Sequence, residues 1–215
     1  MDLLNPYKFK HFYKNKYLLS SLTRRRRYSL SYNYYYKCLW FRTPKVGSRT
    51  INQHFIENTP DKMYIYGSAV SYDPDDFADW FKFSFVREPV ARLVSCWKNK
   101  VLESNMFEFD EGTYEKMKVF EFFLTWVEAQ NIDTAEEHLR SQHMLIDHQN
   151  LNFLGKLESF ESDLQTVAER IGMPLKNIHK KNQSTNQKIE LSEEISNRIK
   201  KIYAKDFELF YPELI

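Results

Sequence analysis

A short apolar strand that runs into a loop and then into a helix is the feature that most limits the folds open to this chain. Lys37–Arg42 form an apolar run that ends abruptly, which predicts a buried strand. Beyond the loop, Ile51 and Phe55 lie four residues apart, as on one face of a helix from about residue 48 to residue 57. A buried strand followed by a helix is typical of sheets with helices packed on their faces.

The alternation of strands and helices continues along the chain. Phe81, Phe83 and Phe85 alternate with polar residues and predict a second strand, and residues 153–158 predict a third. Further apolar stripes predict helices that begin near residues 89, 120, 160 and 193. This order indicates an α/β fold in three layers, with a central parallel sheet flanked by helices.

The chain has no linker and no internal repeat that would divide it. We therefore expect a domain over residues 37–215, preceded by a basic, tyrosine-rich N-terminal extension, residues 1–36, that packs on it. Residues 1–50 contain twelve Lys or Arg and one acid. The run Arg24–Arg27 could attract nucleic acid, anionic lipid or an acidic polysaccharide, or it could be a solvated basic surface. We expect the tyrosines that follow to pack, and we expect no nucleic-acid partner.

The cysteines and the hydropathy pattern indicate in which cellular compartment the protein is expected. Cys38 and Cys96 have no metal-ligand or redox spacing, so we expect two reduced, buried thiols. No apolar run approaches the roughly 18 residues that a membrane span needs, and lysines interrupt the N-terminal segment. The expected localisation is cytoplasmic, with no signal peptide and no integral membrane segment.

The loop after the first strand has the composition of an anion-binding site. In a parallel sheet, ligands bind beyond the carboxyl ends of strands, where helix N-termini present free N–H groups. The loop offers a glycine, two hydroxyls and two cations to a phosphate-like or sulfate-like group: Gly47, Ser48, Thr50, Lys45 and Arg49. It is not a Walker A loop, because its lysine precedes the glycine by two residues. By itself, the loop also fits an ordinary basic turn.

A second cationic segment follows the second strand. Arg87 lies at the end of that strand, directly before a helix, and Ser95 lies about two turns along the helix. An arginine there can bind a second phosphate, and the hydroxyl can join it. Taken alone, Arg87 could instead pair with a local acid such as Glu88 or Asp79.

These two segments resemble motifs of the carbohydrate-type (family 2) sulfotransferases, which take a sulfuryl group from 3'-phosphoadenosine 5'-phosphosulfate (PAPS). Arg42–Thr50 is similar to that family's 5'-phosphosulfate loop, and its Gly-Ser-Arg-Thr sequence is closest to that of uronyl 2-O-sulfotransferases. Phe85–Ser95 is similar to the 3'-phosphate motif. Two weaker similarities follow in the expected order, His138–Gln142 with an H-x-R-x-Q segment and Gly155–Phe160 with a late strand. The resemblance implies a P-loop-like sulfotransferase fold.

The resemblance also implies a role for each matching residue. It implies Lys45 as the catalytic residue, and it implies no metal. For the cofactor it implies the loop residues, the two 3'-phosphate ligands and, loosely, a covering loop: Pro44, Lys45, Val46, Gly47, Ser48, Arg49, Thr50, Arg87, Ser95, Lys181, Ser184 and Thr185. For the acceptor it implies His138, Arg140 and Gln142.

The sequence does not identify which residue acts as the general base. Uronyl-type enzymes carry histidines before the second strand, whereas the corresponding residues here, Tyr66–Val70, contain none. The candidates that are left include histidines and carboxylates: His54, His138, His143, Asp73 and Glu158.

The function that we expect is transfer of a sulfuryl group from PAPS to a hydroxyl of a glycan or similar polyhydroxylated acceptor. Two alternatives come from other classes. A P-loop-like kinase would need a Mg²⁺-binding acid at a strand end, and none stands out in the sequence. A catalytically inert nucleotide- or glycan-binding module would explain the missing histidine as a lost base.

Overall fold

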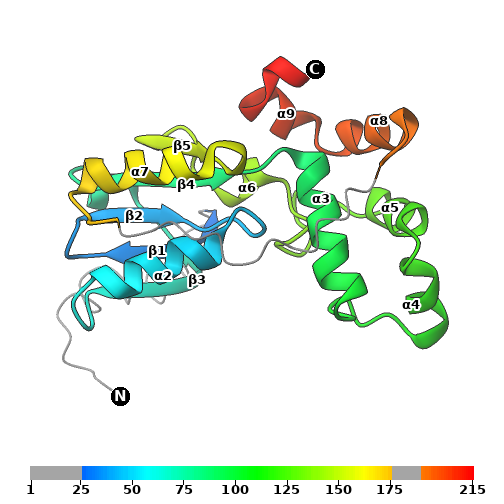
Figure 1. Cartoon of the computed structure of the whole chain (residues 1–215), viewed down its shortest axis with the longest axis horizontal. Coiled ribbons are helices and arrows are strands. Elements are labelled where there is room, and N and C mark those ends of the chain that lie inside the picture. The colour runs from blue at the N-terminus through cyan, green and yellow to red at the C-terminus, as the bar shows by residue number, and fades with distance from the viewer. Residues whose placement is uncertain (1–25, 176–189) are drawn as a thin grey trace.

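The protein forms one five-stranded sheet with helices beside it (Figure 1). The computed structural model describes residues 26–175 and 190–215. The strand order is β3-β1-β2-β4-β5. The strands are β1 (Arg27–Asn33), β2 (Cys38–Phe41), β3 (Tyr64–Ser71), β4 (Phe81–Val86) and β5 (Phe153–Lys156). β2, β4 and β5 pair in parallel, whereas β1 pairs antiparallel with both β2 and β3.

The helices lie in two places relative to the sheet. Figure 1 shows α2 and α7 alongside the strands, and α3, α4, α5 and α8 beyond the ends to which the arrows of β2 and β4 point. The described helices are α2 (Ser48–Asn58), α3 (Pro89–Trp97), α4 (Glu111–Met117), α5 (Phe120–Glu128), α6 (Gln142–Leu145), α7 (Phe160–Ile171), α8 (Glu193–Ile202) and α9 (Ala204–Phe210). Shorter turns are 3-10 helical at Pro74–Phe77, Leu157–Ser159 and Pro212–Leu214, and π-helical at Lys98–Leu102.

At its centre the sheet is buried on both faces, since all four residues of the apolar strand β2 are buried. Successive side chains of a strand point to opposite faces. Cys38 and Trp40 therefore enter one core with α2 and α7, whereas Leu39 and Phe41 enter a second core. The second core continues into α3, α5, α8 and α9, so it joins the sheet to the helical part.

Most elements expected from the sequence are present. The strands that begin near residues 38, 81 and 153 are confirmed, although β5 ends at Lys156 and the next three residues form a 3-10 turn. The helices expected after the loop and near residues 89, 120, 160 and 193 are confirmed as α2, α3, α5, α7 and α8. Ser192 caps α8, since its Oγ accepts from Ile195 N at 3.2 Å. Ser159 occupies the N-cap position of α7, but its side chain makes no capping bond.

The expected parallel sheet is wrong in one respect, because the sheet is mixed. The tyrosine-rich stretch before residue 37 contains β1, which lies between β3 and β2. A tight turn joins β1 to β2, and Asn33 Oδ1 stabilises it by accepting from the N–H groups of Tyr35 and Tyr36, both at 3.1 Å. A turn this short can only join antiparallel neighbours. The sequence-based boundary after residue 36 therefore falls between two strands of one sheet.

The two cysteines lie in the interior and form no disulfide. Cys38 and Cys96 are both buried and free. Burial raises the pKa of Cys96 to about 12, and it raises the pKa of Cys38 as well, so both thiols stay protonated at neutral pH. Over residues 26–175 and 190–215, no helix combines the length and the apolar character that crossing a bilayer requires.

Candidate active site

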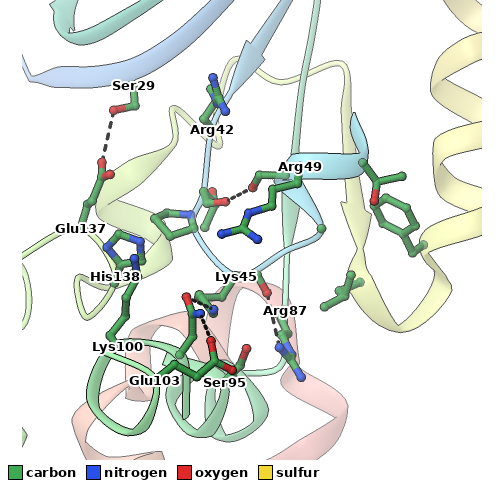
Figure 2. A pocket seen from close by; sticks show the side chains of 18 of the residues that line it. Ser29, Arg42, Lys45, Arg49, Arg87, Ser95, Lys100, Glu103, Glu137 and His138 are labelled. Carbon is green, nitrogen blue, oxygen red and sulfur yellow. Dashed lines mark hydrogen bonds between the residues drawn. The ribbon is translucent and has the colours of Figure 1, made fainter. Parts of the chain in front are cut away.

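A cavity of 640 Å³ lies where the loop after β2 meets α3 and residues 137–138 (Figure 2). Small-molecule sites typically have volumes of about 300–1,000 Å³. The cavity wall carries five cations, Arg42, Lys45, Arg49, Arg87 and Lys100, and two carboxylates, Glu103 and Glu137. This excess of positive charge favours a ligand with several negative charges.

The loop between β2 and α2 is shaped by a glycine that no other residue could replace without strain. Gly47 has φ of 80°, in the left-handed region, and a Cβ at this position would come within 2.7 Å of the Phe160 ring. α2 then begins at Ser48, whose Oγ donates to the Thr43 carbonyl at 2.7 Å. The loop therefore brings backbone close to the cavity at a helix N-terminus, which is the arrangement that suits an anion.

Lys45 lies at the centre of the cavity and is partly desolvated. Its Nζ donates to Asn99 Oδ1 at 3.1 Å, and Asn99 Nδ2 donates to Glu103 at 2.5 Å. Burial lowers the pKa of Lys45 to about 8, and the positive charges of Lys100 and Arg87 act in the same direction. Lys45 itself has φ of 72°, a strained value for a non-glycine residue and one that recurs at functional sites.

Arg87 is held by a side chain from a distant part of the sequence. Its N–H donates to Gln142 Oε1 at 2.9 Å, and Gln142 Nε2 donates to the Arg87 carbonyl at 2.8 Å. The guanidinium lines the cavity together with Ser95. The alternative pairing with a local acid is wrong, because Glu88 caps α3 and Asp79 pairs with Lys37.

Arg92 connects the loop to the segment on the other side of the cavity. It is a buried arginine, 2% exposed, whose guanidinium donates to three backbone carbonyls. The acceptors are Pro44 at 3.3 Å, Glu137 at 3.0 Å and Arg140 at 2.9 Å. One rigid planar group thereby fixes the distance between the loop and residues 137–140.

The structure gathers most of the predicted cofactor residues around this cavity. Those that line it are Pro44, Lys45, Gly47, Ser48, Arg49, Thr50, Arg87 and Ser95. Val46 is fully buried in the core between the sheet and α2, so its side chain has a packing role. Lys181, Ser184 and Thr185 lie outside the described residues.

The comparisons with known proteins agree with this geometry. The profile of the Sulfotransferase family matches residues 29–212. The chain belongs to the sulfotransferase family. Carbohydrate sulfotransferase 14 of Danio rerio is 30% identical over 113 residues, which cover 44% of this chain and 31% of that protein, so the chain spans about a third of that relative's length. No solved structure matches. The carbohydrate-type resemblance is confirmed, whereas the closer likeness to uronyl 2-O-sulfotransferases stays a prediction.

Only one of the three predicted acceptor residues of this sulfotransferase lines the cavity, and that residue is His138. Gln142 is fully buried, and its amide is used on the Arg87 backbone, so its predicted contact with the acceptor is wrong. Arg140 Nε donates to the Ala135 carbonyl at 2.9 Å, away from the cavity wall. The Arg140 side chain thus closes the segment that carries His138, and the Gln142 side chain ties the end of that segment to the backbone of Arg87.

The five candidates for the general base all lie in the described part of the sulfotransferase. They differ in whether they line the cavity. His138 Nδ1 lies 2.9 Å from Glu136 Oε1, and His138 alone of the five lines the cavity. The other four are engaged elsewhere: His54 is buried in α2, His143 Nδ1 lies on Asp206 at 2.9 Å, Asp73 caps a 3-10 turn, and Glu158 accepts from Glu88 N and Tyr211 Oη.

Several cavity residues were not found from the sequence. Asn99 and Glu103 continue the helical spacing that begins at Ser95, so the period of α3 could have indicated them. Arg42 and Tyr66 approach through strand pairing across β1, which no local signal reveals. Glu137 precedes His138 directly and accepts from Ser29 Oγ at 3.4 Å.

One group of side chains could in principle hold a metal ion. Glu136, Glu137 and His138 place ligand atoms within 4.8 Å of one another, in the part of the sulfotransferase that the structure describes. Hydrogen bonds account for this proximity, since Glu136 accepts from the backbone N–H of His138 at 2.7 Å and contacts its ring. The same bonds orient the ring of His138.

Proposed function

We propose that this sulfotransferase transfers a sulfuryl group from PAPS to a hydroxyl of a glycan or similar polyhydroxylated acceptor. The observation that carries the proposal is the convergence of two separate cationic sites on one cavity, Lys45 with the N-terminus of α2 and Arg87 with Ser95. PAPS has two anionic ends, the 5'-phosphosulfate and the 3'-phosphate, which match these two sites. The loop would then serve as a P-loop-like cradle.

The chain's residues have distinct tasks in this reaction. The acceptor oxygen forms a bond to sulfur while the bond from sulfur to the bridging phosphate oxygen breaks, and the hydroxyl proton passes to a base. Lys45 and the N-terminus of α2 stabilise the negative charge that develops on the departing phosphate. Arg87 and Ser95 hold the 3'-phosphate by charge-assisted hydrogen bonds. Arg92 keeps the loop and the acceptor side in register.

We assign the base to His138. When its Nδ1–H donates to Glu136, the other ring nitrogen keeps its lone pair and can take the hydroxyl proton. A carboxylate that fixes the tautomer of a basic histidine is a recurrent catalytic arrangement. Glu137 also lines the cavity and is the other group that could accept the proton.

The sulfotransferase function explains the site better than the two alternatives do. A kinase of the P-loop type needs an acid at a strand end to hold Mg²⁺, whereas β4 leads into Arg87. An inert binding module needs no oriented base, whereas His138 is held by Glu136 beside Lys45 in one cavity.

Calorimetric titration with the product nucleotide, 3'-phosphoadenosine 5'-phosphate (PAP), tests the donor side. We expect PAP to bind more tightly than adenosine 5'-phosphate, which lacks the 3'-phosphate. Arg87→Ala should weaken PAP binding by about 1–3 kcal/mol, as for a charged hydrogen-bonded contact, and should leave adenosine 5'-phosphate unaffected. Arg170→Ala is the control, an exposed arginine of α7 that does not line the cavity. Equal affinities for the two nucleotides would rule out the assignment.

The affinity for PAP should also depend on pH through Lys45. Its pKa of about 8 means that the lysine is charged at neutral pH and loses its proton as the pH rises through that value. Because the protonated form binds phosphate, the dissociation constant should rise above about pH 8, by up to roughly tenfold per pH unit. Bound phosphate itself favours the charged form of Lys45, so the loss of affinity for PAP continues over about two pH units.

Lys45→Arg is the matched variant for this pH dependence, because a guanidinium stays charged throughout. Titrations of PAP at several pH values between about 7 and 9.5 should show a steep loss of affinity for the native protein and a flatter profile for Lys45→Arg. The assignment fails if the two profiles have the same slope.

A further inference from the structure

The C-terminal helix α9 is tied to the strand end that carries Arg87, although no residue of α9 lines the cavity. The connection starts at Asp206, which is 1% exposed. Two N–H groups donate to its carboxylate, Gln142 N at 2.7 Å and His143 N at 2.9 Å, and the His143 ring nitrogen Nδ1 lies at 2.9 Å. A carboxylate buried this deeply needs such partners, so it fixes the backbone at Gln142.

The Gln142 side chain carries this constraint to Arg87. Both ends of its amide bind the backbone of that one residue, since Arg87 N–H donates to Oε1 at 2.9 Å and Nε2 donates to the Arg87 carbonyl at 2.8 Å. Two residues in an antiparallel ladder exchange bonds in the same way. The paired bonds therefore fix the direction in which the Arg87 side chain leaves the backbone.

A second connection ends on the next residue, Glu88. Tyr211 directly follows α9, and its hydroxyl donates to Glu158 Oε2 at 2.9 Å. The other oxygen of that carboxylate accepts from Glu88 N at 2.9 Å. Burial raises the pKa of Tyr211, and the charge of Glu158 acts in the same direction, so the hydroxyl keeps its proton and donates. Two consecutive residues are thus held by side chains that the C-terminal segment holds in turn.

The guanidinium of Arg87 depends on this support from its backbone. Within residues 26–175 and 190–215 it forms no ion pair, and its one hydrogen bond, to the Lys45 carbonyl, is long at 3.5 Å. The head group lies at the end of a long side chain, so a small change in backbone direction moves it far. An arginine binds phosphate best in one planar, bidentate geometry, which such a displacement would spoil.

We propose that Gln142 and Tyr211 are positioning residues, through which α9 directs the Arg87 guanidinium and so sets the preference of the site for a nucleotide with a 3'-phosphate. This rests on the proposed function, in which Arg87 holds that phosphate. The C-terminal segment then takes part in selecting the donor without touching it.

Calorimetric titration of the full chain with PAP and with adenosine 5'-phosphate tests this role. Gln142→Met keeps the length of the side chain and removes both bonds to Arg87. We expect it to lower the ratio of the two affinities about tenfold, within the range for a weakened charged contact, and to leave adenosine 5'-phosphate unaffected. The KM for PAPS should rise while kcat changes little, because Arg87 holds a part of the donor that does not react.

Tyr211→Phe is the milder variant, because it removes only the hydroxyl. It should lower the ratio by about threefold, as for one neutral hydrogen bond. The matched control is Tyr203→Phe, which removes an equally buried hydroxyl of the same C-terminal segment. That hydroxyl donates to the Leu139 carbonyl at 2.7 Å and has no bond toward Arg87. Thermal unfolding should show a similar loss of stability in both variants, whereas the ratio should be unchanged in Tyr203→Phe.

A double variant tests whether the effect passes through Arg87. In the Arg87→Ala background, Gln142→Met and Tyr211→Phe should weaken PAP binding no further, since the residue on which they act is gone. The inference is overturned if the native preference for PAP survives both single variants, if Tyr203→Phe lowers the preference equally, or if the losses persist without Arg87. Equal binding of the two nucleotides by the native protein would instead overturn the proposed function, and this inference with it.

Discussion

Lys45→Ala is expected to lower the rate of sulfuryl transfer by about 10²–10³-fold, the usual cost of removing one group that stabilises developing charge. Lys45 is the cation at the centre of the cavity, and its lowered pKa reports the partly dry surroundings in which a charge acts strongly. The loss should fall mainly on kcat, because Lys45 stabilises the negative charge on the departing phosphate, and this charge grows as the bond to sulfur breaks.

The matched control for this change is Lys100→Ala. Lys100 lines the same cavity, but it lies on the turn after α3, outside the loop. Its removal should reduce the rate by less than about tenfold, as for a cation that only adds to the general field. Initial rates with ³⁵S-labelled PAPS at saturating donor measure both variants. Transfer by Lys45→Ala within tenfold of the native rate would contradict its role.

His138→Ala should lower transfer by about 10²–10⁴-fold, the range for loss of a general base, with an unchanged affinity for PAP. His138 lines the cavity, and within the described residues its ring hydrogen-bonds to Glu136 and forms no hydrogen bond with the loop or with Arg87. Glu136→Gln should have a smaller effect, because it removes the charge that orients the ring and keeps the length of the side chain.

Glu137→Gln distinguishes the two groups that could take the proton. If His138 is the base, this change should alter transfer by less than tenfold, since the Glu137 carboxylate accepts from Ser29 Oγ, a bond that does not orient His138. A loss of transfer in Glu137→Gln, together with near-native transfer in His138→Ala, would assign the base to Glu137 and refute the histidine. Single-turnover rates are the appropriate measurement, because they isolate the chemical step from product release.

The donor side of this site could be predicted from the sequence because its signals are local. The strand, the loop and the helix that hold Lys45 are consecutive in the chain, and so are the strand and helix that hold Arg87 and Ser95. Local patterns of this kind depend on propensity and spacing, which a sequence displays directly. The helix after the loop and the strand at residue 81 were placed correctly for the same reason.

The part of the cavity wall around Arg42 and Tyr66 could not be predicted, because it is made by pairing across the sheet. β1 is hidden in a run of tyrosines, of which Tyr32 and Tyr34 belong to the core, and its insertion between β3 and β2 brings Tyr66 near Arg42. Such a neighbourhood depends on register rather than on local sequence. Gln142 illustrates the opposite error, since a polar residue in a functional motif was expected to face the acceptor and instead supports Arg87 from the interior.

Transfer of ³⁵S from PAPS is the measurement that tests the central claim most directly. The native protein is incubated with labelled PAPS and a panel of polysaccharides and small alcohols, with Lys45→Ala in parallel. We predict that label appears on a polyhydroxylated acceptor, that PAP is released in equal amount, and that both are lost in the variant. Label that never leaves PAPS, together with turnover of the γ-phosphate of ATP in the presence of Mg²⁺, would contradict the account and indicate a kinase.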